Sequence, residues 1–253
     1  TLESFGISAI GCITVRCVFA SIAFAIAIAL TDKNAFKIKL KDIWCFFGTG
    51  IVSLLIFGLF YFKAMDYMSL SAAAILLYTA PCFVILMSAV LFKENLTKRK
   101  LIAMAIAFLG CCLVSGLGNG ENHISATGLL FGLGAGICYA LFSIFSRYSI
   151  NRGYSSLTIN FYSCILAFIG SMFFGGTQTI QIVCQSSGNF FFAVATGIVT
   201  CFLPYLLYTW GLERMESGKA AILVAVVAIV GIVAAVKKHG GSQPEPVSLS
   251  EGE

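Results

Sequence analysis

The chain contains long apolar stretches that recur along its whole length, each close to the thickness of a bilayer when coiled as a helix. A helix needs about 20 apolar residues to cross the hydrocarbon core of a membrane. Eight stretches of this kind can be delimited in the 253 residues: 7–30, 43–62, 69–92, 101–117, 128–148, 157–174, 190–211 and 220–236. The sequence therefore predicts an all-α polytopic membrane protein with about eight transmembrane helices.

The composition supports this prediction and excludes several other classes of protein. Hydrophobic residues make up 59% of the chain and charged residues 11%, whereas soluble proteins contain about 25% charged residues. These values exclude a disordered chain, a nucleic-acid binder and an ordinary cytosolic enzyme. Strand-like alternation is absent from the sequence, which argues against a membrane β-barrel. The first stretch is not expected to be a cleaved signal peptide, because it is too long and lacks a basic start.

Lysine and arginine residues fall on alternate connections between the predicted helices. Twelve of them lie on four connections, 31–42, 93–100, 147–152 and 212–219. The intervening connections carry only Lys63. Basic connections face the cytoplasm in multi-span proteins, so we assign these four to the cytoplasmic side. With eight helices, both chain ends then lie outside, which leaves Lys237 and Lys238 on the unfavourable side.

Two segments resemble each other at a constant offset of 147 residues. Residues 61–77 (YFKAMDYMSLSAAAILL) align with residues 208–224 (YTWGLERMESGKAAILV). In both segments a tyrosine and an acidic turn precede a run of small residues. The charge pattern places the first turn outside and the second inside, so the two copies are inverted in the membrane. Inverted repeats are typical of secondary transporters, whose substrate site lies near the midplane between the repeats. Chance alignment of alanine-rich and leucine-rich runs is the alternative interpretation.

The repeat also indicates which helices the chain lacks. The helix at 128–148 has no counterpart in the first half, and roughly one helix is missing after residue 236. Restoring both produces ten helices with both ends in the cytoplasm, which is also the expected side for the basic residues that follow residue 236. The predicted organisation is a first repeat at 1–118, a second repeat at 119–236 and a disordered polar tail at 237–253.

Several motifs together resemble the EamA-type members of the drug/metabolite transporter superfamily. They are the Thr-Val-Arg-Cys-Val-Phe run at 14–19, Tyr61–Ala64, the small-residue run 71–74, Tyr78–Pro81, the Lys-Glu-Asn-Leu-Thr turn at 93–97, Tyr208–Leu212 and Ser217–Leu223. Each motif is loose, but their order and spacing over 7–236 are specific. The resemblance implies an intact protein of ten helices and export of amino acids or related compounds. The chain departs from the family in lacking the first helix and a second-half counterpart of the 93–97 turn.

Arg16 is the only cation well inside a predicted helix. An unpaired charge at the bilayer centre costs about 2.5–3.5 kcal/mol on insertion scales, so this side chain should face the bundle interior or water. One interpretation is that Arg16 attracts a substrate carboxylate or another anion. The alternative is a snorkelling or helix-tying arginine close to the outer interface.

Pro81 and Pro204 are the only prolines within the predicted helices. Each removes a backbone hydrogen bond and frees a carbonyl one turn earlier. A membrane helix tolerates this where neighbours satisfy the carbonyl or where it lines a cavity, so the two prolines mark either a substrate pocket or packing kinks. The other pocket candidates are polar or aromatic residues of the predicted helices: Tyr61, Tyr78, Thr79, Tyr139, Ser143, Asn160, Tyr205, Tyr208 and Trp210. For Asn160, a hydrogen bond that ties two helices is the alternative.

Gly128, Gly132 and Gly136 form two small-xxx-small steps, which allow a second helix to approach closely. We expect this glycine face to pack within the chain or, because the first-half counterpart helix is absent, to form a dimer contact. The ten cysteines lack Cys-x-x-Cys spacing, and His123 and His239 lie outside the predicted helices. The sequence therefore predicts no metal site and no histidine relay. It contains no P-loop and no nucleophile–base arrangement, so neither an enzyme nor a cofactor is predicted.

The sequence thus predicts a secondary transporter of the plasma membrane that moves a small metabolite by alternating access between inverted repeats. The expected partners are a small-molecule substrate and the lipid bilayer, with a homodimer as an option and no nucleic acid. No acidic residue lies convincingly inside a predicted helix, so both proton coupling without an evident carrier and facilitated diffusion stay open. The other hypothesis is a truncated or degenerate, non-transporting membrane protein that dimerises through the glycine face.

Overall fold

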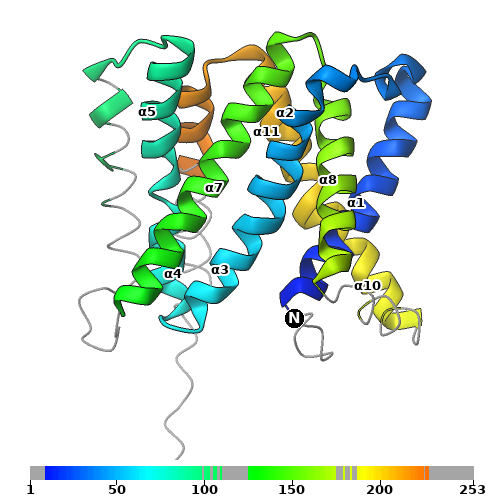
Figure 1. The fold of residues 1–253 in the computed structure, drawn as a ribbon, viewed down its shortest axis with the longest axis horizontal. Helices are drawn as coiled ribbons and strands as arrows, with labels where there is room; N and C mark the ends of the chain where they lie inside the picture. The colour runs from blue at the N-terminus through cyan, green and yellow to red at the C-terminus, as the bar shows by residue number, and fades with distance from the viewer. Residues whose placement is uncertain are drawn as a thin grey trace, which may run out of the picture.

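A computed structural model describes residues 9–98, 100–102, 105–106, 109, 125–174, 179, 183, 187–224 and 226–227. Regular structure within these residues is entirely helical (Figure 1). Five described helical stretches are long and apolar enough to cross a membrane: Ile10–Thr31, Leu40–Met65, Ala126–Asn151, Ser156–Phe173 and Gly188–Arg214. Large apolar side chains on them, such as Leu30, Phe173 and Phe191, are exposed, as is expected of surfaces that face lipid. The predicted all-α membrane fold is confirmed.

The described elements follow one another as a series of helices that run up and down the molecule (Figure 1). The first half contains α1 (Ala9–Thr31), η2 (Lys33–Phe36), η3 (Leu40–Asp42), α2 (Ile43–Phe47), η4 (Gly48–Ile56), α3 (Phe57–Met65), α4 (Leu70–Leu77) and α5 (Ala80–Phe92). The second half contains α7 (Ala126–Asn151), α8 (Ser156–Phe173), α10 (Ser187–Gly197), η5 (Ile198–Phe202) and α11 (Leu203–Arg214), followed by helical residues 217–224. In the first half α2, η4 and α3 form one continuous helix, and in the second half α10, η5 and α11 form another.

The stretch 69–92, which the sequence predicts as one helix, is broken into α4 and α5. Pro81 lies in the first turn of α5, where its missing N–H breaks no helical hydrogen bond. The Thr79 hydroxyl donates to the Leu76 carbonyl at 2.6 Å and so closes the end of α4. The single-helix prediction is wrong here because proline ends a helix more readily than it kinks one. Most of the predicted helix 101–117, the cysteines and histidine at 111, 112 and 123, and the tail 237–253 lie outside the described residues.

Two of the long helices contain a π-helical stretch, η4 and η5. Such stretches are rare and often mark functional sites. Subtracting 147 from the bounds of η5 gives 51 and 55, which lie within η4. The two π-helical stretches therefore occupy equivalent positions in the two repeats. The turn between α3 and α4 lies at the lower end of the molecule, whereas the turn after α11 lies at the upper end (Figure 1). Equivalent turns at opposite ends are what inverted repeats require.

The basic connections gather at one end of the bundle. Figure 1 shows the four connections 32–42, 93–97, 152–155 and 215–216 at the upper end and the α3–α4 turn at the lower end. This is the arrangement that the charge pattern predicts. The total of ten helices and the repeat boundaries 1–118 and 119–236 stay predictions.

The glycine face of α7 packs against a neighbouring segment of the same chain. A Cβ added at Gly128 would lie 2.8 Å from the Met68 side chain, and one at Gly132 would lie 2.4 Å from the Leu76 side chain. At Gly136 it would lie 3.2 Å from the backbone carbonyl of Leu76. The glycines therefore allow α4 and the turn before it to lie close to α7, and in this structure α4 covers the face that the dimer hypothesis requires.

We expect Gly132→Ala to lower the free energy of unfolding in detergent by about 1–3 kcal/mol, because the added Cβ overpacks the contact with Leu76. Gly211→Ala is the matched control, since nothing lies within 4 Å of a Cβ at that position. The control should stabilise the protein or leave it unchanged, because alanine favours a helix over glycine by about 1 kcal/mol. Equal effects in a thermal unfolding assay would contradict close packing at Gly132.

Candidate functional site

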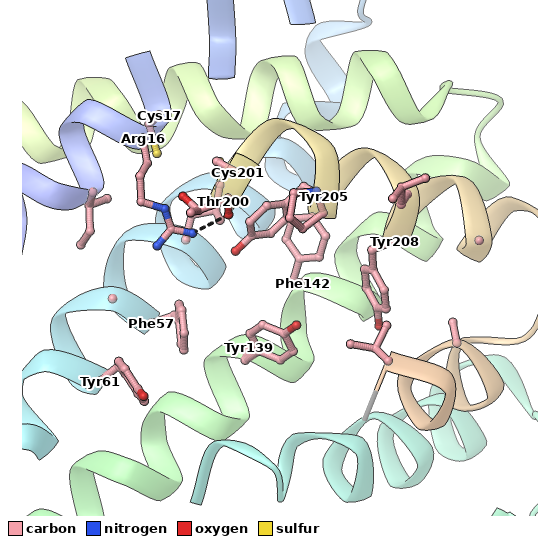
Figure 2. A pocket seen from close by; sticks show the side chains of 18 of the residues that line it. Arg16, Cys17, Phe57, Tyr61, Tyr139, Phe142, Thr200, Cys201, Tyr205 and Tyr208 are labelled. Atoms are coloured by element: carbon pink, nitrogen blue, oxygen red, sulfur yellow. Dashed lines mark hydrogen bonds between the residues drawn. The ribbon is translucent and has the colours of Figure 1, made fainter. Parts of the chain in front are cut away.

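A cavity of about 650 Å³ lies between the two halves of the bundle. It is lined by side chains of α1, α3, α7, η5 and α11 and by the helical residues after 217 (Figure 2). Its volume falls within the range of about 300–1,000 Å³ that is usual for small-molecule sites. Most of its lining is apolar or aromatic, with a few polar groups that converge on the space, among them Arg16, Tyr61 and Tyr205.

Equivalent positions of the two repeats line this cavity. The first half contributes Leu54, Phe57, Gly58 and Tyr61, and adding 147 to each number leads to Cys201, Pro204, Tyr205 and Tyr208, which also line it. One helix of each repeat therefore contributes the equivalent face to the cavity wall, and the two helices are inverted relative to each other. This is the placement expected of a substrate site between inverted repeats.

The Arg16 side chain points from α1 into the cavity (Figure 2). Its Nη2 donates to the backbone carbonyl of Thr200 at 3.0 Å. Its Nε is buried and has no hydrogen-bond partner among the described residues. One nitrogen thus ties α1 to η5, and the guanidinium also lines the cavity, where attraction of an anion stays a prediction.

Pro204 explains why the Thr200 carbonyl is available to Arg16. In a regular helix the amide of residue 204 would donate to the carbonyl of residue 200, but proline has no N–H. A carbonyl left unpaired inside a membrane costs several kcal/mol, and the Arg16 guanidinium donates to this one. Pro204 therefore acts through Arg16, a connection that the sequence alone does not reveal.

Aromatic side chains form much of the remaining wall (Figure 2). The Tyr205 and Phe142 rings meet edge to face with centroids 5.0 Å apart, and the Phe57 and Tyr139 rings lie 5.5 Å apart. The Tyr208 hydroxyl bonds the Ser143 hydroxyl at 2.6 Å. These contacts hold the rings in fixed positions around the cavity.

A second, smaller cavity of about 200 Å³ adjoins the first. Tyr139 and Tyr208 line both cavities. Tyr78 and Pro81, at the break between α4 and α5, line only the smaller one. Pro81 and Pro204 therefore border two adjoining cavities rather than a single pocket.

Four of the predicted site residues, Thr79, Ser143, Asn160 and Trp210, are absent from the lining of both cavities. Ser143 reaches the site only through its hydrogen bond with the Tyr208 hydroxyl. Thr79 closes α4 and faces Gly136 of α7. Asn160 is buried, and its Nδ2 donates to the Thr209 hydroxyl at 2.6 Å and the Tyr205 carbonyl at 3.2 Å, so it ties α8 to α11. The Trp210 side chain is exposed and lies beneath the Arg214 guanidinium, 3.8 Å from the ring centroid.

Thiol groups to which sequence analysis gave no role lie beside Arg16. Cys17 and Cys201 line the main cavity (Figure 2), and Cys164 lies 3.9 Å from Cys201, sulfur to sulfur. All three are buried in one apolar cluster. Sequence analysis missed Cys201 as a lining residue, and its equivalent Leu54 was not a candidate either.

A charged cluster ties the two repeats together at the upper end. Glu94 accepts hydrogen bonds from the amides of Ser217 at 2.9 Å and Gly218 at 3.3 Å, at the start of the helix after α11. The Lys100 ammonium lies 3.7 Å from the Glu94 carboxylate and 2.6 Å from that of Glu216. The carboxylate from the turn at 93–97 thus caps a helix of the other repeat, a favourable place for negative charge. Met215, next to this cluster, lines the main cavity, so the cluster lies beside the part of the cavity that faces the basic connections.

Bonding to the Lys100 ammonium, helped by Lys219, holds the pKa of Glu216 below its ordinary value of 4.5. A carboxyl whose pKa is lower in the folded than in the unfolded state stabilises the fold above its unfolded pKa. This contribution is lost as the pH falls through the folded-state pKa. The ion pair is therefore intact at neutral pH and weakens only in acid.

The comparisons with known proteins agree with this geometry. The profile of the EamA-like transporter family matches the chain twice, over residues 4–116 and 126–240. An uncharacterized transporter of Archaeoglobus fulgidus is 24% identical over 228 residues, which cover 90% of this chain and 79% of that protein. The uncharacterized transporter YxxF of Bacillus subtilis is 25% identical over 208 residues, which cover 80% of this chain and 63% of that protein. A solved crystal structure superposes with a TM-score of 0.74 at 19% identity over 96% of this chain and 83% of that one, a likeness in fold.

Arg16→Gln should destabilise the protein by about 1–2 kcal/mol, because it weakens the only described side-chain partner of the Thr200 carbonyl. In a Pro204→Ala background the loss should be smaller, since the new amide of residue 204 can take that carbonyl. The predicted coupling energy is about 1 kcal/mol in a double-mutant cycle of thermal unfolding in detergent. Strict additivity would show that Pro204 and Arg16 act independently.

Glu94→Gln should lower the free energy of unfolding by about 2–4 kcal/mol, because it leaves the buried Lys100 ammonium with one carboxylate fewer. The control is Asp66→Asn, which breaks the exposed ion pair with Lys63 at the other end of the molecule. That pair should contribute little to stability, because water and salt screen exposed charges. If both variants melt like the wild type, the upper cluster does not hold the repeats together.

Proposed function

Because the chain belongs to the EamA-like transporter family, we propose that it is a secondary transporter that carries a small organic metabolite across the plasma membrane. The family is one of transporters rather than enzymes, and the chain is a multi-pass membrane protein. The observation that carries the proposal is the cavity of about 650 Å³ lined by equivalent faces of both repeats.

The proposed mechanism is alternating access. In this structure the Glu94 cluster joins the two repeats at the end that carries the basic connections, which we assign to the cytoplasm. Opening of that end requires the amides of Ser217 and Gly218 to separate from the Glu94 carboxylate. Rocking of one repeat against the other would then expose the cavity to the cytoplasm while the lower end closes. The cluster is polar and lies at a helix terminus, so water can replace its hydrogen bonds when it opens.

The resemblance to EamA-type proteins supports export of amino acids or related compounds. None of the described lining residues of the main cavity is acidic or a histidine, so no described carboxylate or imidazole there can carry a proton. We therefore propose either facilitated diffusion or coupling through a group outside the lining. The second hypothesis, a non-transporting protein that dimerises through Gly128, Gly132 and Gly136, has less support because α4 covers that face.

The test is flux of a labelled metabolite panel, amino acids included, into and out of liposomes that hold the purified chain. Gly211→Phe should abolish any flux, because Gly211 lines the cavity, nothing lies within 4 Å of its added Cβ, and a phenyl ring there fills the path. Ile26→Phe introduces the same ring on an exposed position of α1 and should leave flux unchanged. Absence of flux for every compound, in protein that is folded by thermal unfolding, would contradict the proposal.

A further inference from the structure

The described lining of the main cavity carries positive charge and no negative charge. Arg16 is the only ionised side chain among its described lining residues. Its guanidinium carries five N–H donors, yet the only hydrogen bond that it makes to the described residues is with the Thr200 carbonyl, and no described carboxylate forms an ion pair with it. A desolvated cation without a counter-ion attracts an anion strongly. A substrate carboxylate is the group that matches this geometry best, because it can accept two parallel hydrogen bonds from a guanidinium.

No described carboxylate lines the cavity to pair with a substrate ammonium, and the Arg16 guanidinium repels a second positive charge. The carboxylates nearest to the upper end of the cavity are already engaged: Glu94 caps a helix, Glu216 bonds Lys100, and Glu213 accepts from the Ser156 amide at 2.6 Å. The carbonyl that Pro204 frees is occupied by Arg16. Burial of an ammonium without a partner is costly, so a positively charged group is penalised in this cavity.

The remaining wall fits an apolar or aromatic body. Beyond Arg16 the space is bordered by the rings of Phe57, Tyr139, Phe142 and Tyr205 (Figure 2). Aromatic rings of a ligand gain stacking and edge contacts in such an environment. The hydroxyls of Tyr139 and Tyr205 form no hydrogen bond with any residue that the structure describes, so they can donate to oxygen atoms of a ligand.

We infer that the substrate class of this cavity is the amphipathic monocarboxylate, with an apolar or aromatic body and without a free ammonium group. The inference rests on the proposed transport function and narrows its substrate. The carboxylate binds Arg16, and the body lies among the aromatic rings towards Tyr208. Zwitterionic amino acids are poorer ligands than the corresponding deaminated acids because their ammonium group has no counter-charge.

The test compares three compounds with the same phenyl-alkyl skeleton: 3-phenylpropionate, phenylalanine and phenethylamine. Binding to the purified chain in detergent is measured by calorimetry at neutral pH, and counterflow is measured in liposomes with protein-free liposomes as the blank. We expect 3-phenylpropionate to bind at least about 10-fold more tightly than phenylalanine, and phenethylamine not to compete. Equal or tighter binding of phenylalanine or phenethylamine would overturn the inference.

Arg16→Gln should weaken binding of 3-phenylpropionate about 10-fold or more, and it should not weaken binding of phenethylamine, because the lost charge repels that cation. Arg214→Gln is the matched control, because it removes one positive charge from an arginine that is exposed outside the cavity; its binding should stay within about 2-fold of the wild type. Unchanged binding in a folded Arg16→Gln variant would overturn the inference. If that variant does not fold, two other results decide the question. They are the binding of Arg16→Lys, which keeps the charge, and the ligand preference of the wild type.

Failure of the inference and failure of the proposed function give different results. Arg16-dependent binding of 3-phenylpropionate without counterflow would contradict transport but support the ligand class. Counterflow of phenylalanine in preference to 3-phenylpropionate would support transport and overturn the ligand class.

Discussion

A backbone carbonyl inside a bilayer has no water to bond, so every one must find a partner within the protein. In this protein the carbonyl of Thr200, freed by Pro204, finds that partner in the guanidinium of Arg16 on another helix. The same contact removes part of the cost of an arginine at membrane depth. It also fixes α1 against the π-helical stretch η5, which brings the remaining guanidinium nitrogens to the cavity. Two features that are unfavourable in isolation, an intramembrane proline and an intramembrane cation, therefore satisfy each other.

The other polar interactions between helices fall into two groups, one at the upper end of the molecule and one in its interior. At the upper end, carboxylates bond helix-start amides and lysines, as Glu94 does with Ser217 and Lys100. Such contacts lie where water can replace them, which suits surfaces that separate during a transport cycle. In the interior, Asn160 and Thr209 tie α8 to α11 through buried hydrogen bonds. Opening of these would leave polar groups unpaired in an apolar medium, so we expect α8 and α11 to move together.

The repeat explains why so much of the cavity could be anticipated. Tyr61 and Tyr208 are equivalent in sequence and line the cavity from opposite repeats, and Pro204 lies on the same face. Trp210, in contrast, is only two residues from Tyr208 but points outwards beside Arg214. A polar or aromatic residue in an apolar helix does not reveal which way it faces when lipid and interior are equally apolar. Cys201 was missed for the same reason, since a small apolar residue looks alike on either face.

The sequence by itself determined the fold class, the five long membrane helices among the described residues, the common side of the basic connections and the family. These follow from local composition, because twenty apolar residues and the distribution of lysines and arginines have the same meaning wherever the helices pack. Only the tertiary structure decided that the helix at 69–92 is broken before Pro81, that α4 covers the glycine face, and that Arg16 is the donor for Thr200. These depend on which helix lies opposite which, and residues 184 apart in sequence carry no local signal of their contact.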